Sequence, residues 1–209
     1  MGLEHRGGGG PKRGGEPHSV IYLASTSPRR RALLKRAGIT FRILRPDYEE
    51  GKELKAPSSK IVQAHAVKKA KSCMGQIKNG TVLAADTVVS LDGKIFGKPK
   101  TMKEARLILG KLQGRRHFVY TGVAIFKLVE GRAVKRTVFF EKTEVRLKGL
   151  TARGIENYFK RVNPLDKAGA YAIQSPHGGI VQGVSGLFSN AVGLPVETIL
   201  KKVRLGSTP

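Results

Sequence analysis

The sequence of 209 residues predicts an α/β fold in which helices flank a mixed, twisted sheet. Strand-like and helix-like segments alternate along the chain from residue 20 onward. Residues 81–89 form an apolar run rich in β-branched side chains, which is typical of a strand buried on both faces. Residues 117–128 and 134–147 form two long β segments joined by Glu130 and Gly131, and the charged positions of the second segment indicate a half-exposed sheet.

The composition limits the class of protein. Lysine and arginine total 39 against 15 acidic residues, which gives a formal net charge of +24. Such a surface attracts polyanions in a salt-dependent way, so a basic nucleic-acid-binding protein is one alternative. Aromatic residues are sparse, basic residues occur in nearly every segment, and the sequence has no zinc-finger, homeodomain or RNP-like pattern. We therefore expect nucleic acid to bind only non-specifically, through the net positive charge.

The cysteine count and the hydropathy pattern indicate the compartment. The single cysteine, Cys73, excludes an intramolecular disulfide and favours a reducing, cytoplasmic setting. No apolar run is long enough to cross a bilayer, so we expect no contact with a membrane. Residues 1–17 are basic, rich in glycine and without apolar periodicity, which predicts a disordered tail followed by a single catalytic domain over 18–209.

The first informative stretch joins a strand over 20–24 to a helix over 28–37 through a hydroxyl-bearing loop at 25–27. Backbone N–H groups and the positive end of the helix dipole converge at such a junction. Three arginines in the first helical turn, Arg29 to Arg31, oppose that dipole unless an anionic ligand binds there. The alternative is that they form a solvated basic face.

An acidic loop follows a second short strand over 41–44. Asp47, Glu49 and Glu50 place three carboxylates in four positions, which can hold a hard divalent cation, and a solvated surface loop is the alternative. Residues 58–78 then carry apolar side chains at helical spacing and predict a helix.

The apolar strand over 81–89 carries a carboxylate, Asp86, in its middle. Burial of an unpaired carboxylate costs several kcal/mol. Asp86 therefore needs a cation, hydrogen-bond donors or a catalytic task. The alternative is that Asp86 lies at the end of the strand, where backbone N–H groups satisfy its carboxylate. Asp92 and Gly93 predict a hairpin turn whose returning strand brings Lys98 opposite Asp86.

Capping patterns predict two of the later helices. Thr101 and Glu104 form a capping box that starts a helix ending at Gly114. Thr151 caps a further helix, which Pro164 ends.

Small residues mark the remaining connections. Gly122 can bring the backbone close to a ligand, and the glycines of 178–183 predict a flexible connection. Pro195 suits the first turn of a C-terminal helix over 196–203.

A third stretch, residues 166–174, combines charge with small side chains. Asp166 and Lys167 are followed by small residues that allow close approach of the backbone to a ligand. Gln174 offers both a donor and an acceptor, which is the chemistry needed to read the edge of a base.

Five motifs together resemble the Maf family of nucleoside triphosphate pyrophosphatases, in order along residues 20–205. These motifs are 25–30 (STSPRR), 85–87 (ADT), 97–99 (GKP), 166–174 (DKAGAYAIQ) and 192–195 (VGLP). The resemblance implies a fold of two lobes around a central cleft, like that of inosine triphosphatases, and a homodimer. It also implies hydrolysis of a nucleoside triphosphate between its α and β phosphates with a divalent metal cation, Mg²⁺ or Mn²⁺.

The resemblance also implies roles for individual residues. Asp86 matches the proton acceptor, and Glu50 and Asp86 match the metal ligands. Positions that contact the triphosphate or decide specificity are matched by Ser25, Arg29, Arg30, Lys69, Thr87, Lys98, Asp166, Lys167 and Gln174. Among these, Arg29, Thr87 and Gln174 are similar to the branch that acts on dTTP and UTP. We therefore expect hydrolysis of dTTP, UTP and modified pyrimidine nucleotides; a pyrophosphatase for 7-methyl-GTP or another purine nucleotide is the alternative.

Overall fold

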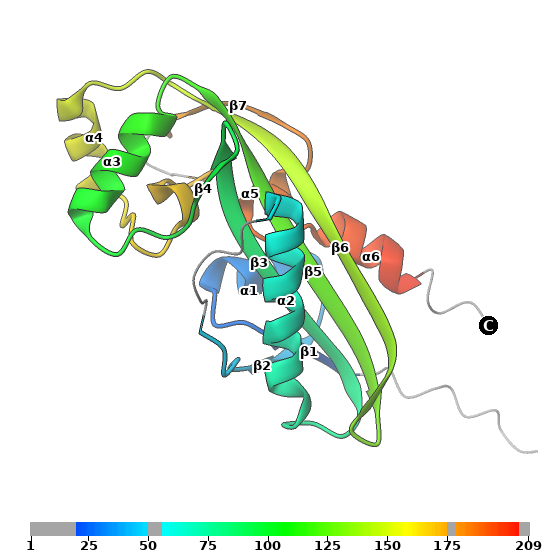
Figure 1. The fold of residues 1–209 in the computed structure, drawn as a ribbon. Helices are drawn as coiled ribbons and strands as arrows, with labels where there is room; N and C mark the ends of the chain where they lie inside the picture. Colours follow the sequence, from blue (N-terminus) through cyan, green and yellow to red (C-terminus); the bar gives the residue numbers. More distant parts are fainter. Residues whose placement is uncertain (1–19, 50–55, 175–178, 205–209) are drawn as a thin grey trace, which may run out of the picture.

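The structure, a computed structural model, describes residues 20–49, 56–174 and 179–204. Within them, one mixed sheet of seven strands is flanked by helices, as the sequence predicts (Figure 1). The strands are β1 (Ile21–Ala24), β2 (Phe41–Leu44), β3 (Gly80–Leu91), β4 (Lys94–Phe96), β5 (Arg116–Val129), β6 (Arg132–Leu147) and β7 (Val181–Ser185). The helices are α1 (Pro28–Arg36), α2 (Ser58–Met74), α3 (Met102–Leu112), α4 (Ala152–Phe159), the 3-10 turn η1 (Ala168–Ala170), α5 (Phe188–Val192) and α6 (Val196–Arg204). The glycine-rich tail and Glu50 lie outside the described residues.

The sheet combines parallel and antiparallel pairing. Its order is β2-β1-β3-β5-β6-β7, and β4 pairs with β3. β1 runs parallel to β2 and β3, because α1 and α2 serve as the crossovers. β3, β5, β6 and β7 follow one another antiparallel. Glu130 and Gly131 have φ values of 50° and 77°, the left-handed backbone that a two-residue hairpin turn requires, so the long hairpin is confirmed.

Alternate residues of β3 enter separate parts of the core. Val82 and Ala84 pack with α2, which covers one face of the sheet. Leu83 and Ala85 pack with residues of α1 and α6 on the other face. At the far end of the long strands, Val89 belongs to a third cluster formed with α3 and α4. Figure 1 shows these helix groups at the two ends of the sheet, which gives the molecule its two lobes.

Two helices end earlier than the sequence predicts. α2 ends at Met74 rather than at Lys78, because Gly75 follows and the next two N–H groups donate to carbonyls three residues back, as in a turn. α4 ends at Phe159, before Pro164 is reached. The capping box is present at the start of α3, where the N–H of Glu104 donates to the Thr101 hydroxyl.

Two glycines have different roles from those predicted. Gly183 does not lie in a flexible connection: it belongs to β7 and pairs with Arg146, because the edge of β6 supplies the hydrogen-bonding partner. Gly122 approaches a helix rather than a ligand. A Cβ atom on Gly122 would lie 2.3 Å from the backbone of Val62, so glycine is what lets α2 rest on β5.

None of the helices in the described part of the chain is both long and apolar enough to span a membrane.

Candidate active site

The central strand β3 is unpaired along part of one edge, and this stretch locates the cavity. β1 pairs with β3 only as far as Leu83, and β4 pairs with it only from Val89 onward. Among the described residues, no strand pairs with 84–88 on that edge. Asp86 and Thr87 point to opposite faces of the sheet, as neighbours in a strand do. Both line one cavity because it opens at the strand edge and not above a single face.

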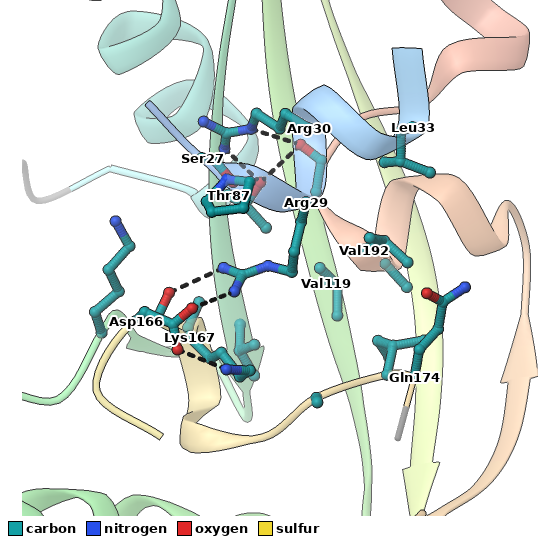
Figure 2. Close-up of a pocket in the computed structure, with 18 of the residues that line it drawn as sticks. Ser27, Arg29, Arg30, Leu33, Thr87, Val119, Asp166, Lys167, Gln174 and Val192 are labelled. Atoms are coloured by element: carbon teal, nitrogen blue, oxygen red, sulfur yellow. Dashed lines mark hydrogen bonds and ion pairs between the residues drawn. The ribbon is translucent and has the colours of Figure 1, made fainter. Parts of the chain in front are cut away.

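Arg30 is held beside this unpaired stretch by three hydrogen bonds. Its guanidinium donates to the Thr87 hydroxyl at 3.1 Å, to the carbonyl of Gly193 at 2.9 Å and to the Ser25 hydroxyl at 3.2 Å. Figure 2 shows the side chain turned back toward Thr87 from the start of α1. The positive charge of Arg30 is therefore fixed at the rim of the sheet, next to the first turn of a helix.

Asp86 is buried, with 5% of its surface exposed, and is paired with a lysine of α2. Lys69 Nζ lies 2.5 Å from Asp86 Oδ1, and both side chains are largely shielded from solvent. This ion pair meets the requirement that a buried carboxylate has a compensating partner. Lys98, which the sequence analysis places opposite Asp86, lines the same cavity.

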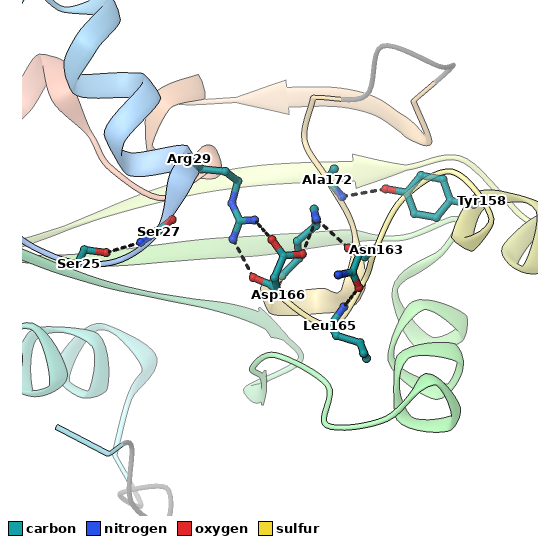
Figure 3. A network of polar contacts seen from close by, with 9 residues as sticks. Ser25, Ser27, Arg29, Tyr158, Asn163, Leu165, Asp166 and Ala172 are labelled. Carbon is teal, nitrogen blue, oxygen red and sulfur yellow. Dashed lines mark hydrogen bonds and ion pairs between the residues drawn. The ribbon is translucent and has the colours of Figure 1, made fainter. Parts of the chain in front are cut away.

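Arg29 points the other way and reaches across the cavity. It donates to Asp166 Oδ2 at 2.6 Å and to the Asp166 carbonyl at 2.9 Å, and Lys167 Nζ lies 2.5 Å from Asp166 Oδ1 (Figures 2 and 3). Partial burial raises the pKa of Asp166, but the hydrogen bonds from Lys167 and Arg29 outweigh it and hold the pKa below its usual value. Asp166 therefore stays ionised and links two cations from opposite sides of the cavity.

The segment that carries Asp166 continues as a tight turn. Gly169 has a φ of 74°, and a Cβ atom there would lie 2.9 Å from a side-chain carbon of Val89, so only glycine fits. Tyr171 follows, with its hydroxyl 2.7 Å from His117 Nε2. Burial lowers the pKa of His117 to about 4, so its ring is neutral at pH 7.

The cavity formed between these two sides has a volume of about 390 Å³. Six basic side chains line it: Arg29, Arg30, Arg36, Lys69, Lys98 and Lys167. Among the described residues, Asp86 and Asp166 are the two carboxylates that face them. Gln174 lies away from the ion pairs, at the other side of the space (Figure 2). The cavity thus has a strongly cationic part and a part that ends in an amide, within the usual size range for small-ligand sites.

The structure brings most of the sequence-predicted site residues together. Those that line the cavity are Arg29, Arg30, Lys69, Asp86, Thr87, Lys98, Asp166, Lys167 and Gln174. Ser25 does not line it: its buried hydroxyl accepts from the Ser27 N–H and from Arg30, so it braces the loop. Glu50 lies outside the described residues, and its neighbours Asp47 and Glu49 are exposed.

A chain of polar contacts behind the cavity is not predicted by the sequence analysis. The hydroxyls of Thr87 and Thr121 lie 3.0 Å apart, and Thr121 donates to the carbonyl of Asn190. The buried amide of Asn190 donates in turn to the Thr143 hydroxyl at 2.9 Å. These polar residues connect Arg30 to β6, and the available signal was Thr121 shortly before the apolar run 123–126 of the same strand.

The donor set fits a divalent cation that is shared with a ligand. In the described part of the chain, no three His, Cys, Asp or Glu side chains gather into a metal site. Mg²⁺ is usually held by one or two carboxylates together with phosphate oxygens and water. Asp86, a buried carboxylate beside a cationic cavity, fits that arrangement when a phosphate supplies the remaining oxygens.

The fold and the cavity define an α/β protein with a phosphate-binding cleft, cut into the edge of a mixed sheet at the start of a helix. The family described as Maf-like protein matches residues 20–205, so the chain belongs to the Maf family.

Similar proteins agree with this assignment. A dTTP/UTP pyrophosphatase of Caldanaerobacter subterraneus subsp. tengcongensis is 46% identical, over 86% of this chain and 85% of the relative. A dTTP/UTP pyrophosphatase of Pelotomaculum thermopropionicum is 41% identical, over 86% and 92%. The solved structure of the Staphylococcus aureus Ham1 protein has a TM-score of 0.50 at 18% identity and covers 90% of this chain and 99% of its own, which supports the fold.

Proposed function

We propose that this chain is a pyrophosphatase that hydrolyses dTTP and UTP to the nucleoside monophosphate and pyrophosphate. The observation that carries the proposal is a buried carboxylate, Asp86, at the unpaired edge of β3 within a cavity lined by six basic side chains. The names of the similar proteins support the choice of substrate.

The basic side chains bind the triphosphate in this proposal. A nucleoside triphosphate carries about four negative charges near neutral pH, and cations that face its oxygens stabilise the charge that develops as the bond breaks. Arg30 is already oriented by Thr87, Ser25 and Gly193, so little reorganisation is needed when phosphate oxygens arrive. Lys98 adds charge from the loop after β4.

Asp86 is the proton acceptor in this proposal. A water molecule attacks the α phosphorus, the new P–O bond forms, the bond to the β phosphate breaks, and pyrophosphate leaves. The carboxylate of Asp86 takes the proton of the water as the attack proceeds. Lys69 holds that carboxylate in position from α2. A divalent cation, Mg²⁺ or Mn²⁺, would be held by Asp86 and Glu50 and would supply charge neutralisation at the phosphate oxygens.

Gln174 reads the base in this proposal. Its amide lies at the side of the cavity away from the ion pairs, where a donor and an acceptor can meet the O4 and N3–H groups of uracil or thymine. Arg29 and Thr87 complete the set of specificity residues. The same site would act on modified pyrimidine nucleotides that keep this edge.

The organisation of the whole chain also belongs to the proposal. One catalytic domain would span residues 18–209, after the glycine-rich segment 1–17. The protein acts as a homodimer in the cytoplasm.

The test is a panel of nucleotides incubated with Mg²⁺ or Mn²⁺, with pyrophosphate and monophosphate measured as products. We expect turnover of dTTP and UTP to exceed that of the purine nucleotides. Preferred turnover of 7-methyl-GTP would assign the chain to the alternative branch. No turnover of any pyrimidine triphosphate would overturn the proposal.

A further inference from the structure

A group of aromatic side chains lies on the surface of the sheet, apart from the cavity. Phe118 and Tyr120 of β5 have ring centres 6.4 Å apart, and Tyr120 lies 6.3 Å from Phe140 of β6. Phe140 is 43% exposed, although it is a large apolar residue. The chain has few aromatic residues, so this concentration on one surface is unusual for its composition.

The strand register places these rings on one face, where Phe140 is exposed and Phe118 and Tyr120 are half-buried. Tyr120 pairs with Lys142, and Gly122 pairs with Phe140, so all of these positions belong to the face that α2 covers. α2 reaches this face at Gly122, where Val62 packs, and within residues 20–49, 56–174 and 179–204 no helix covers the adjoining part of β5 and β6 (Figure 1). The rings are not part of the cavity lining, which includes Val119 from the opposite face of β5 and, on this face, Val88 of β3, the partner of Tyr120 in the register.

Basic side chains surround the rings. Lys142 Nζ lies 3.7 Å from the ring centre of Phe118 and 5.8 Å from that of Tyr120. Arg116 and Arg146 pair with each other across β5 and β6 on the same face, and both are exposed. Glu144 is the acidic member of the group and lies 3.8 Å from Arg116. We call this group the aromatic-basic face: Arg116, Phe118, Tyr120, Phe140, Lys142, Glu144 and Arg146.

We propose that the aromatic-basic face binds single-stranded nucleic acid. Bases stack on the rings of Tyr120 and Phe140, while Lys142, Arg116 and Arg146 contact the phosphates. Exposed aromatic rings on a sheet beside cations are the combination that single strands require, because every base has a face that can stack. Binding is therefore independent of sequence yet located at one place, and is not spread over the whole basic surface.

Charge favours a polyanion over a second copy of this chain as the occupant. A two-fold contact through this face would bring two copies of the same patch together, so the three cations and the single carboxylate of one copy would meet three cations and a single carboxylate of the other. Like charges opposed in an interface are unfavourable, whereas a phosphate backbone complements them.

The test is fluorescence anisotropy with labelled 20-nucleotide poly(dT) and with a duplex of the same length, at several salt concentrations. We expect the single strand to bind more tightly, since a duplex hides the faces of its bases. Phe140→Ala and Tyr120→Ala are each expected to weaken binding of the single strand about tenfold. Leu107→Ala, which removes another exposed apolar side chain, on α3, is the matched control and should bind as the wild type does.

A second pair of variants measures the contribution of charge to binding of the single strand. Lys142→Gln should reduce the salt slope of binding by about one, whereas Lys103→Gln on α3 removes the same charge and should leave the slope unchanged. Equal binding of duplex and single strand, or equal effects of the two lysine variants, would mean diffuse charge attraction and would overturn the proposal. Conversion of a dimer to a monomer by Phe140→Ala in sedimentation would assign the face to a second copy instead. Release of pyrophosphate by the Phe140→Ala and Tyr120→Ala variants reports that they are folded.

Discussion

The two sides of the cleft are built in different ways. On one side, Asp86 and Thr87 belong to a central strand whose other edge is paired with β5 throughout, and Arg30 belongs to a helix. The other side is the segment from Asp166 to Gln174, which contains only the 3-10 turn η1. Gly169 and Ala170 both have left-handed backbone there, with φ values of 74° and 61°.

Separate hydrogen bonds hold the second side in place. The N–H of Gly169 donates to the carbonyl of Gly97, and the N–H of Ala172 donates to the Tyr158 hydroxyl (Figure 3). The ion pair of Arg29 with Asp166 then joins this segment to the helix side. The sheet therefore fixes Asp86, the group that the proposed chemistry needs most, while the side that carries Gln174 is held by contacts that can be lost one at a time.

Replacement of the carboxylate on the sheet side should have the largest effect. Asp86→Asn keeps the shape and a hydrogen bond to Lys69 but removes the proposed proton acceptor, so kcat should fall about 10²- to 10⁴-fold. The measurement is steady-state release of pyrophosphate from dTTP. Asp92→Asn, in the hairpin turn next to β4, is the matched control and should retain wild-type kcat. Wild-type activity in Asp86→Asn would assign the proton to another group.

Backbone strain introduced into the segment from Asp166 to Gln174 should have the next largest effect. Gly169→Ala forces a left-handed backbone on alanine and brings its Cβ to 2.9 Å from Val89, so we expect a loss of about 2–3 kcal/mol in the free energy of unfolding. Urea unfolding measures it. Gly183→Ala is the control, because a Cβ there meets no atom within 4 Å. Equal losses in both variants would show that the turn is not constrained.

The buried histidine behind the second side makes stability depend on pH. The pKa of His117 is about 4 in the folded protein against 6.5 when unfolded, so the unfolded chain binds more protons between these values. Stability should therefore be complete above pH 6.5 and fall by about 1–3 kcal/mol as the pH decreases toward 4. Urea unfolding of wild type and His117→Gln at pH 7 and pH 4.5 measures the difference. A variant as pH-dependent as the wild type would contradict this assignment.

The ion pair that joins the two sides should have the smallest effect. Asp166→Asn removes the charge that orients Arg29 and Lys167, both of which are partly exposed to solvent. We expect KM for dTTP to rise about two- to fivefold with kcat unchanged, because such pairs contribute little in water. A fall in kcat at constant KM would mean that Asp166 acts on the reacting phosphate.

The sheet side was largely predictable from the sequence. Apolar periodicity predicts β3, and an aspartate in the middle of that run predicts a buried group with a partner. Three arginines at the start of a helix predict an anionic ligand, and two of them line the cavity. These signals are local, because each depends on a residue that is out of place in its own segment.

The elements that the sequence left unpredicted depend on contacts between distant residues. β7 contains Gly183 and few apolar residues, and it becomes a strand because β6 offers it an edge. Asn190 finds its partners on β5 and β6, far away along the chain. Asp86 is paired with Lys69, which comes from α2, so the crossing of α2 over the sheet decides this contact. The spacing of residues along the sequence does not predict how α2 crosses the sheet.

The unpaired stretch of β3 also bears on how the protein avoids aggregation. An exposed strand edge is ordinarily a template on which another chain can add a strand. Here β1 and β4 bound the stretch over 84–88, so an incoming strand would collide with one of them before it gained a useful number of backbone hydrogen bonds. The opening in the sheet is thus large enough for a small molecule and too short for a polypeptide.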